Sequence, residues 1–380
     1  MDGQVERFSA KGSNIDNAAQ AFQTALLSGI SSSMCSVNTI STPPVSSFPK
    51  CKDIYIKGET ATNSVSIGYI NIPIIKHIHK AIRVRRALKR IMKPGVDYHI
   101  VIYGIHSPFL LSLMGIKRDK YKSCLIAPDL PEFMSESKNV LYRIAKRVDR
   151  FIIDRQLKNI DCYVLFSELM LERLKIERPH IVIEGIYQNG SSEVEYPTKD
   201  RNKVVFYSGT LDYRYGIMNL IKAFESIQDP SYKLWICGQG NSADEIKKHA
   251  KKDQRIKYLG VIPRNEVLIL QRQATVLVNP RSSAEEYTKY SFPSKTMEYL
   301  ASGTPTIMSH LKSIPSEYDS HIYYLEDESV DGIRDKIISV CNKPADELAS
   351  FGEQASTFIK EEKNNIKQAN KLITFLKTIS

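Results

Sequence analysis

The sequence predicts an α/β protein made of two Rossmann-like, doubly wound domains that face each other across a cleft. Short apolar runs alternate with longer helical patterns, which indicates parallel sheets covered by helices on both faces. This alternation occurs twice, before and after a polar stretch at residues 188–203. The length of 380 residues suits two domains, because a domain commonly has about 150 residues.

The first half of the chain contains the first series of elements. Apolar residues at helical spacing predict helices at residues 15–29, 74–92 and 138–160. Short apolar runs predict buried strands at residues 99–104, 122–127, 161–166 and 180–184. We therefore assign residues 1–190 to the first domain.

The second half repeats the pattern more regularly. Apolar runs predict strands at residues 204–209, 233–238, 256–260, 275–280 and 304–309. Helical patterns fall between them, at residues 216–227, 242–251, 264–272 and 294–302. We assign residues 191–203 to a linker and residues 204–354 to the second domain. The apolar spacing of residues 355–379 predicts one long helix, which makes residues 355–380 a C-terminal helical segment.

Composition bounds the class of protein. There is no stretch of about 20 apolar residues, and the first residues lack the basic-then-apolar pattern of a signal peptide. The six cysteines are not arranged at metal-ligand spacing. We therefore expect a cytoplasmic protein with reduced thiols and no metal site.

The basic excess belongs to the first half of the chain. The formal net charge is +11, and residues 1–190 contain 27 Lys and Arg against 17 Asp and Glu, while the remainder contains 26 against 25. The predicted helices at 74–92 and 138–160 carry much of this charge, and we expect it to contact the inner leaflet of a membrane. The alternative is a pair of ordinary helices with solvated basic faces. Nucleic acid is not expected, because aromatic residues do not interleave with these charges.

The segment from Arg281 to Pro305 carries the most chemical information. Arg281 follows a predicted strand, and open α/β sheets bind ligands at the carboxyl ends of their strands. Lys295 lies in the first turn of the next predicted helix, where a cation opposes the helix dipole unless the helix start holds an anion. Glu298 lies on the same helical face, about 4.5 Å further along the axis. The three side chains suit a ribose and a diphosphate; the alternative is a surface helix with a solvated Lys–Glu pair.

The run FPSKTMEYLASGTPTI at residues 292–307 resembles the donor-site signature of family 4 of the retaining glycosyltransferases, which have the GT-B fold. The bacterial polysaccharide-assembly members are the most similar. The likeness extends to YSGTLDYRYGIMNLIKAF, LWICGQG, IKYLGVIP and VNPR in the second half, and more weakly to DYHIVIYGIHSP and APDLPEFM in the first. The resemblance implies an acceptor-binding first domain, a donor-binding second domain and a C-terminal helix that crosses back to the first.

The resemblance also implies roles for individual residues. Glu298 matches the glutamate that binds the donor ribose, and residues 292–295 match the loop and helix start that hold the diphosphate. The corresponding residues are Phe292, Pro293, Ser294 and Lys295. Gly209 matches the glycine of the first loop of the donor domain, and Gly238 and Gly240 match the glycines after its second strand. Val261 and its neighbours Ile262 and Pro263 are expected near the nucleotide base.

Three positions depart from the family pattern. Tyr290 stands where the family often has a second glutamate, whose role would fall to Glu285 or Glu286. Thr210 and Tyr215 stand where the family often has an arginine and a lysine in the first loop. Arg214 is adjacent to the second position and is expected to replace it, with Arg281 and Lys295 supplying the remaining positive charge.

The first half should bind the acceptor. His106 follows a predicted strand and is a candidate catalytic residue, with a purely structural histidine as the alternative. Asp129 follows the next strand and is a candidate for contact with the donor sugar or the acceptor hydroxyl; the alternative is a helix N-cap. Gly12, Ser13 and Asn14 either line the cleft or form a simple turn.

The resemblance implies a metal-independent reaction with retention of configuration. Lys295 and Arg281 would stabilise the leaving diphosphate, so no cofactor is expected beyond a UDP- or GDP-sugar substrate. The expected acceptor is a polyprenyl-diphosphate-linked saccharide, in capsule, O-antigen or exopolysaccharide synthesis. The alternatives are a degenerate glycosyltransferase-like binding module without turnover, and another GT-B enzyme such as a sugar-nucleotide epimerase.

Overall fold

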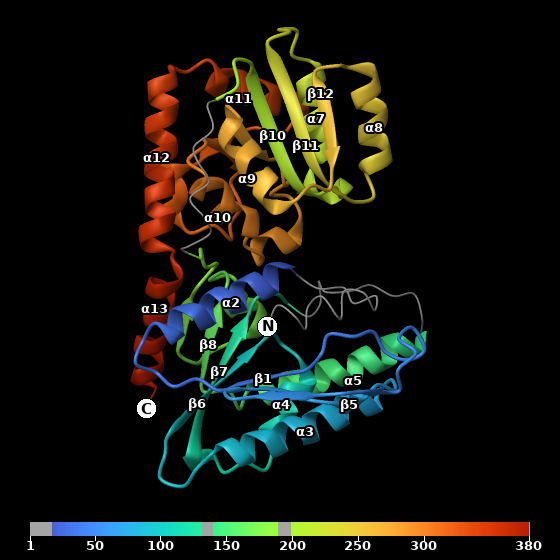
Figure 1. Cartoon of the computed structure of the whole chain (residues 1–380), viewed down its shortest axis with the longest axis vertical. Helices are drawn as coiled ribbons and strands as arrows, with labels where there is room; N and C mark the ends of the chain where they lie inside the picture. Colours follow the sequence, from blue (N-terminus) through green and yellow to red (C-terminus); the bar gives the residue numbers. More distant parts are fainter. Residues whose placement is uncertain (1–16, 131–139, 189–198, 380) are drawn as a thin grey trace. The chain divides into compact units, whose positions relative to one another are not determined.

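The computed structural model describes residues 17–130, 140–188 and 199–379. Contacts between Cα atoms divide the chain into two compact units, which are described separately (Figure 1). The first unit comprises Met1–Ile183 with Gln368–Ser380, and the second comprises Glu184–Lys367.

The second unit is built on a parallel sheet of six strands. In sequence order these are β10 (Lys203–Thr210), β11 (Tyr232–Gln239), β12 (Ile256–Gly260), β13 (Val276–Asn279), β14 (Thr306–Ser309) and β15 (Tyr323–Leu325). Their order in space is β12-β11-β10-β13-β14-β15. This is the 3-2-1-4-5-6 order of a Rossmann fold, whose direction reverses between β10 and β13. All five strands predicted for this half of the chain are confirmed.

Helices cover both faces of this sheet. They are α7 (Ile217–Glu225), α8 (Ala243–Lys252), α9 (Arg264–Gln273), α10 (Ser294–Ala301), α11 (Val330–Cys341) and α12 (Ala345–Glu362), with 3-10 turns η3 (Tyr213–Tyr215), η4 (Glu286–Lys289) and η5 (Ser316–His321). Alternate residues of β10 point to opposite faces. Val205 and Tyr207 join a core with α7 and α11, whereas Val204 and Phe206 join a core with Tyr299 of α10. The four predicted helices, at 216–227, 242–251, 264–272 and 294–302, are confirmed.

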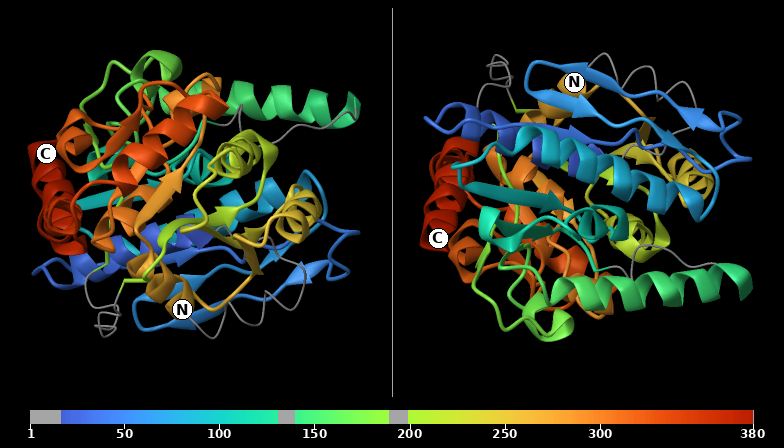
Figure 2. Two further views of the ribbon diagram at one scale, coloured as in Figure 1. Left: turned by 90° about the horizontal axis from the view of Figure 1, so that it is seen from above. Right: turned by 90° about the horizontal axis from the view of Figure 1, so that it is seen from below.

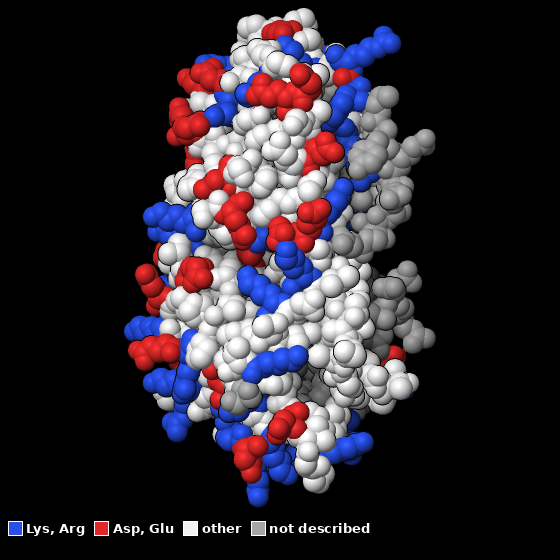
Figure 3. All heavy atoms as spheres, turned by 90° about the vertical axis from the view of Figure 1, so that its left-hand side faces the viewer, with Lys and Arg blue, Asp and Glu red and all other residues white. Residues whose placement is uncertain are grey.

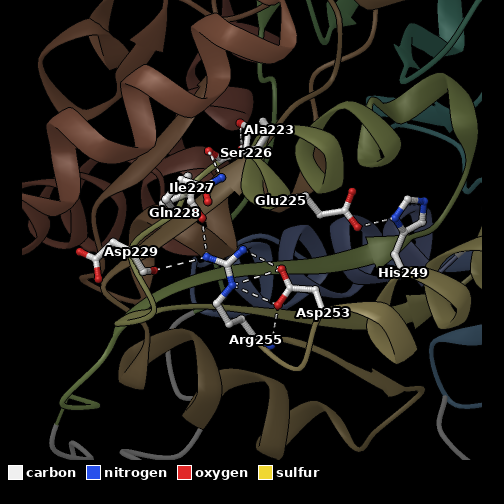
Figure 4. Close-up of polar contacts among 9 residues, drawn as sticks. All are labelled: Ala223, Glu225, Ser226, Ile227, Gln228, Asp229, His249, Asp253 and Arg255. Carbon is white, nitrogen blue, oxygen red and sulfur yellow. Dashed lines mark hydrogen bonds and ion pairs between the residues drawn. The ribbon is translucent and has the colours of Figure 1, made fainter.

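A polar network fixes the amino edge of the sheet, opposite the carboxyl ends of the strands (Figure 4). Arg255, just before β12, forms a fork with the Asp253 carboxylate, with contacts of 2.7 to 3.2 Å. The same guanidinium donates to the backbone oxygens of Ile227 and Asp229 beyond the end of α7. His249 of α8 pairs with Glu225 of α7 across 2.6 Å. These contacts join α7, α8 and β12 at the amino edge of the sheet.

The first unit contains a smaller parallel sheet. Its strands are β6 (Tyr98–Tyr103), β7 (Tyr121–Ala127), β8 (Cys162–Leu165) and β9 (His180–Val182), arranged in sequence order. Its described helices are α2 (Asn17–Ser31), α3 (Ile75–Ile91), α4 (Ser107–Ser112), α5 (Val140–Leu157), α6 (Met170–Leu174) and most of α13 (Asn365–Thr378), with η1 at Arg118–Lys120. The three helices and four strands predicted for this half are confirmed. Phe22 of α2 packs 4.8 Å from the Phe166 ring centre, next to β8.

Residues 39–70 form two small sheets that the sequence did not predict. One joins β1 (Thr39–Ser41), β4 (Ser64–Ser66) and β3 (Glu59–Ala61), and the other pairs β2 (Tyr55–Ile56) with β5 (Tyr69–Ile70). Figure 2 shows α3 beside these strands. Strands of two or three residues are too short to produce an alternating pattern, which explains why they were missed.

The prediction of a single helix at residues 355–379 is wrong. The structure has two helices, α12 and α13 (Asn365–Thr378), separated at Lys363 and Asn364. The Lys363 carbonyl accepts a hydrogen bond from the Tyr187 amide instead of continuing the helix. The Asn364 side chain accepts from the Lys367 amide at 2.8 Å, which is an N-cap contact that starts the new helix.

Candidate functional site

The carboxyl ends of β10 and β13 bring the main candidate residues together. β10 ends at Gly209 and Thr210, and β13 is followed by Pro280 and Arg281. The strand order reverses between these neighbouring strands, which is where open α/β sheets bind their ligands. α10 begins at Ser294, as predicted, so Lys295 lies in its first turn.

Lys295 reaches the end of β10. Its Nζ donates to the backbone carbonyl oxygen of Ser208 and lies 5.4 Å from the centre of the Tyr207 ring. Burial lowers the pKa of Lys295 to about 8, and the nearby Glu298 carboxylate only partly opposes this shift. An ammonium group has three donors, so Lys295 retains donors for a ligand. A buried cation of this kind favours the arrival of an anion.

Gly209 makes this position of Lys295 possible. Its φ is +148°, and a Cβ built on it would fall on the Lys295 Nζ. Gly238, directly opposite in the β10–β11 register, would place a Cβ on the Gly209 carbonyl oxygen. Gly240 would place one on the backbone of Leu211. The glycines at 238 and 240 therefore allow two loops to pack backbone against backbone.

Glu298 is held by two polar side chains from α9. Gln271 Nε2 donates to its Oε1 at 2.7 Å, and Arg264 Nη2 lies 3.6 Å from its Oε2. The Glu298 side chain is 29% exposed and that of Arg264 is 74% exposed. Sequence reasoning missed both partners, because the contact between α9 and α10 is not visible in either local pattern. The carboxylate remains accessible and oriented, as binding to a ribose would require.

Arg281 lies against two neighbouring aromatic rings, whose centres are 6.5 Å apart. Its Cζ is 4.5 Å from the centre of the Tyr287 ring and 5.2 Å from that of Tyr215. Its Nε is buried without a hydrogen-bond partner in the described part of the chain. Guanidinium groups bind favourably over aromatic faces. Tyr215, which departs from the family pattern, therefore helps to position Arg281; Tyr287 was not identified from the sequence.

The first-loop residues do not add a second cation here. Arg214 forms a fork with Asp212 at 3.0 and 3.1 Å, so its charge is compensated within the loop. Thr210 is exposed, and its carbonyl accepts from the Tyr207 hydroxyl at 2.9 Å. The Arg214 side chain is 64% exposed, and its expected role in place of the missing lysine stays a prediction.

The loop between β13 and α10 is held by apolar packing near α10 and by hydrogen bonds near β13. Phe292 and Pro293 are buried, and the Phe292 ring packs 5.6 Å from that of Tyr318. Ser294 is exposed, and Tyr290 ends η4. Glu328, which the sequence did not single out, accepts from the Ser282 hydroxyl at 2.8 Å and from the Ser283 amide.

The carboxylates proposed for the donor sugar are exposed on this loop. Glu285 precedes η4 and Glu286 begins it. Val261, expected near the base, is 69% exposed after the end of β12. The structure assigns no contact between these residues and Lys295 or Arg281.

His106 of the first unit lies at the carboxyl end of β6, before α4. Burial and the charge of Lys80 lower the pKa of His106, while Asp149 of α5 acts in the opposite direction. A neutral imidazole at this position could accept a proton. The charges of Lys80 and Asp149 therefore act on His106 in opposite directions.

Asp129 follows β7 and is partly buried. Most of the segment DLPEFM, which Asp129 was expected to cap, lies outside the described residues. Gly12, Ser13 and Asn14 also lie outside them.

No group of acidic, histidine or cysteine side chains among the described residues could hold a metal ion. Within the same residues, no helix is both long and apolar enough to cross a membrane. All six cysteines are unpaired thiols, of which Cys35 alone is exposed.

Comparisons with known proteins agree with this fold. Residues 191–358 match the family described as "Glycosyl transferases group 1". No curated protein matches the chain in sequence. Among solved structures, a sucrose-phosphate synthase from Thermosynechococcus elongatus is 16% identical with a TM-score of 0.62, and the match covers 93% of this chain and 92% of that one.

Two further structures contain bound UDP. Anabaena HepE in complex with UDP is 12% identical with a TM-score of 0.61, over 83% of this chain and 86% of that one. A TarM variant from S. aureus, in complex with fondaparinux, alpha-GlcNAc-glycerol and UDP, is 13% identical with a TM-score of 0.55. That match covers 83% of this chain, which spans only 62% of the length of TarM. The sequence of residues 191–358 is thus similar to the glycosyl transferases group 1 family, and the chain has the GT-B fold.

Proposed function

We propose that this protein is a retaining glycosyltransferase that uses a UDP- or GDP-linked sugar as donor. The observation that carries this proposal is that Arg281 follows β13 while Lys295, in the first turn of α10, reaches the end of β10, at the two neighbouring strands between which the strand order reverses. We call Lys295, Arg281, Glu298 and the first turn of α10 the donor site. It combines two cations for a diphosphate with one carboxylate for ribose hydroxyls.

The start of α10 can add backbone donors to this site. Pro293 has no N–H group, and the Thr296 amide already donates to the Pro293 carbonyl at 2.8 Å. The amides of Ser294 and Lys295 are therefore the candidates for binding a phosphate oxygen at this helix start. Together with the Lys295 ammonium group, these two amides would bind one side of the diphosphate.

Transfer would then depend on stabilising the leaving diphosphate. The bond between the anomeric carbon and the diphosphate oxygen breaks as the acceptor hydroxyl oxygen bonds to the same face of that carbon. The acceptor's proton passes to the departing diphosphate. Negative charge grows on the diphosphate during this step, so Lys295 and Arg281 would contribute most in the transition state. No protein-bound metal is required in this scheme.

The acceptor is proposed to be a polyprenyl-diphosphate-linked saccharide at the inner face of the plasma membrane, in capsule, O-antigen or exopolysaccharide synthesis. His106 and Asp129 in the first unit are the candidate residues on the acceptor side. On the face drawn in Figure 3, basic and acidic side chains are interspersed. The proposed membrane contact is instead made by two basic helices, α3, whose sequence contains no Asp or Glu, and α5. Salt-sensitive sedimentation with anionic liposomes would test it, and equal sedimentation with neutral liposomes would reject it.

A binding module without turnover is the second candidate, because the Arg214 charge is taken up by Asp212. The discriminating experiment measures nucleoside diphosphate release from a panel of UDP- and GDP-sugars in the presence of a chelator. The glycosyltransferase proposal predicts release with one donor, and a strong loss of release in Arg281→Ala and Lys295→Ala. Lys248→Ala, which removes an exposed cation of α8, is the matched control and should retain most of the activity. Nucleotide binding without any release would favour the binding module.

A further inference from the structure

The first unit contains a pocket of about 460 Å³ between α3 and the strands at residues 55–68. It shares no residue with the donor site and lies in a different compact unit. Its volume falls within the range of small-molecule sites, roughly 300 to 1,000 Å³. The pocket therefore needs its own explanation.

Four cationic side chains line this pocket, and no Asp or Glu does. They are Lys57, Arg83, Arg86 and Arg90. The three arginines follow one another at spacings of three and four residues on α3, which places them on one helical face. None of the four forms an ion pair within the residues that the structure describes. Lys57, Arg86 and Arg90 are exposed and Arg83 is partly buried, so all four remain available to an anion that enters the pocket.

Arg83 shows the same imbalance at a single atom. Its Nε is buried and has no hydrogen-bond partner among the described residues. Burial, together with the charges of Arg83 and Arg86, lowers the pKa of the neighbouring His79. The His79 Nδ1 accepts a hydrogen bond from the Ile70 amide at 3.1 Å, so this nitrogen carries no proton. The positive potential of the pocket thus comes from the arginines and Lys57.

The opposite wall is made of closely packed backbone. A Cβ on Gly58 would collide with the backbone of Ser66 and Gly68, and one on Gly68 would collide with Gly58 and Ile56. Larger residues at these positions would separate the strands that form the wall. The pocket is therefore a built feature of the small sheets and α3 rather than a gap between mobile side chains.

We propose that this pocket binds a phosphate-bearing ligand, either a phosphomonoester or a diphosphate. Arginine forks match the paired oxygens of phosphate groups, and three of them converge here with one lysine. The inference goes beyond the donor site and does not depend on it, since neither the residues nor the compact unit is shared.

The first test is a calorimetric titration with inorganic pyrophosphate at low ionic strength. It uses a Lys295→Ala background, so that a weakened donor site does not dominate the signal. We expect pyrophosphate binding to weaken at least about tenfold in Arg86→Ala/Arg90→Ala. Lys89→Ala is the matched control, because Lys89 is an exposed cation of α3 outside the pocket. Equal weakening in this control, or no binding to the unsubstituted pocket, would overturn the proposal.

A second variant keeps the charge and removes the space. Thr60 is an exposed pocket residue, and Thr60→Trp should block pyrophosphate while leaving all four cations in place. Binding that survives Thr60→Trp would mean that the anion sits on the open surface, which contradicts a pocket. Melting temperatures of all variants show that a loss of binding is not a loss of folding.

Vesicles distinguish a lipid headgroup from a soluble ligand. Phosphatidic acid in phosphatidylcholine vesicles presents a phosphomonoester at a membrane surface. A lipid ligand predicts that Arg86→Ala/Arg90→Ala and Thr60→Trp each reduce vesicle binding more than Lys89→Ala does. A soluble ligand predicts pyrophosphate binding in the pocket with no such difference on vesicles. Failure of both probes to distinguish pocket variants from the control would overturn the proposal.

Discussion

The ammonium group of Lys295 bonds to the backbone carbonyl of Ser208, in space that exists because the following residue is a glycine. This contact joins the first turn of α10 to the end of β10. It holds a cation at the position where a Rossmann-type sheet binds its ligand. The proposed donor site depends on this contact between Lys295 and Ser208.

Gly209→Ala should disrupt the donor site. The new methyl group would occupy the position of the Lys295 Nζ, and the residue has a φ of +148° that alanine adopts unfavourably. We expect a destabilisation of about 1 to 3 kcal/mol and loss of UDP binding, measured by melting with and without UDP. Gly95→Ala is the control, since Gly95 has a φ of +75° but open space around it. Unchanged UDP binding in Gly209→Ala would contradict the proposed position of Lys295.

UDP binding should be linked to protonation of Lys295. Its pKa of about 8 lies below the ordinary 10.5, so this group makes the free protein more stable as pH rises from about 8 to 10.5. A bound diphosphate would raise the pKa again. UDP affinity should therefore fall as pH rises through 8, with proton uptake on binding.

Calorimetry in buffers of different ionisation enthalpy measures this uptake. Lys80 and Lys199 also have pKa values of about 8, so stability alone would not identify the group. Lys295→Arg is the specific control, because arginine stays protonated. The same proton uptake in this variant as in the unsubstituted protein would rule out Lys295 as the linked group.

The ribose role of Glu298 can be tested from both partners. Glu298→Ala should weaken UDP binding by about 1.5 to 3 kcal/mol, the usual value of hydrogen bonds to a charged group. UDP analogues that lack a ribose hydroxyl should bind the unsubstituted protein more weakly than UDP does, by a similar free energy. The same analogues should bind Glu298→Ala almost as well as UDP does. Glu286→Ala provides a control on the adjacent exposed loop. Additive losses from the analogue and the substitution would show that Glu298 does not contact the ribose.

A buried ion pair should make a large contribution to the stability of the second unit. Lys363 and Glu184 are 4% and 2% exposed and lie 2.6 Å apart, and the Tyr318 hydroxyl donates to the same carboxylate at 2.6 Å. Lys363→Met leaves that carboxylate buried without its counter-charge, at a cost of about 3 to 5 kcal/mol. Glu184→Gln/Lys363→Met should recover part of the loss.

Urea denaturation with Lys367→Ala as control measures this effect. Lys367 pairs with Glu362 at the surface, where both side chains are about half exposed. Its removal should cost no more than about 1 kcal/mol. Equal costs for Lys363→Met and Lys367→Ala would show that burial does not strengthen the inner pair.

The second unit was predictable from sequence because its parallel strands are buried on both faces and read as continuous apolar runs. Gly303 and Pro293 further marked the ends of α10. The partners Arg264 and Gln271 of Glu298 were not predictable, because they come from another helix. The same holds for the contact of Arg281 with the Tyr215 and Tyr287 rings, which depends on two loops meeting in space. Short strands at residues 39–70 left no periodic signal, and the pocket beside α3 was missed with them.

The most direct test of the central claim is thermal melting with UDP, GDP and ADP, without added metal. A nucleotide at 100 times its dissociation constant should stabilise the protein by about 2.7 kcal/mol. The account predicts stabilisation by UDP or GDP that is lost in both Lys295→Ala and Glu298→Ala. Stabilisation that persists in both variants, or no stabilisation by any nucleotide, would contradict a donor site at the start of α10.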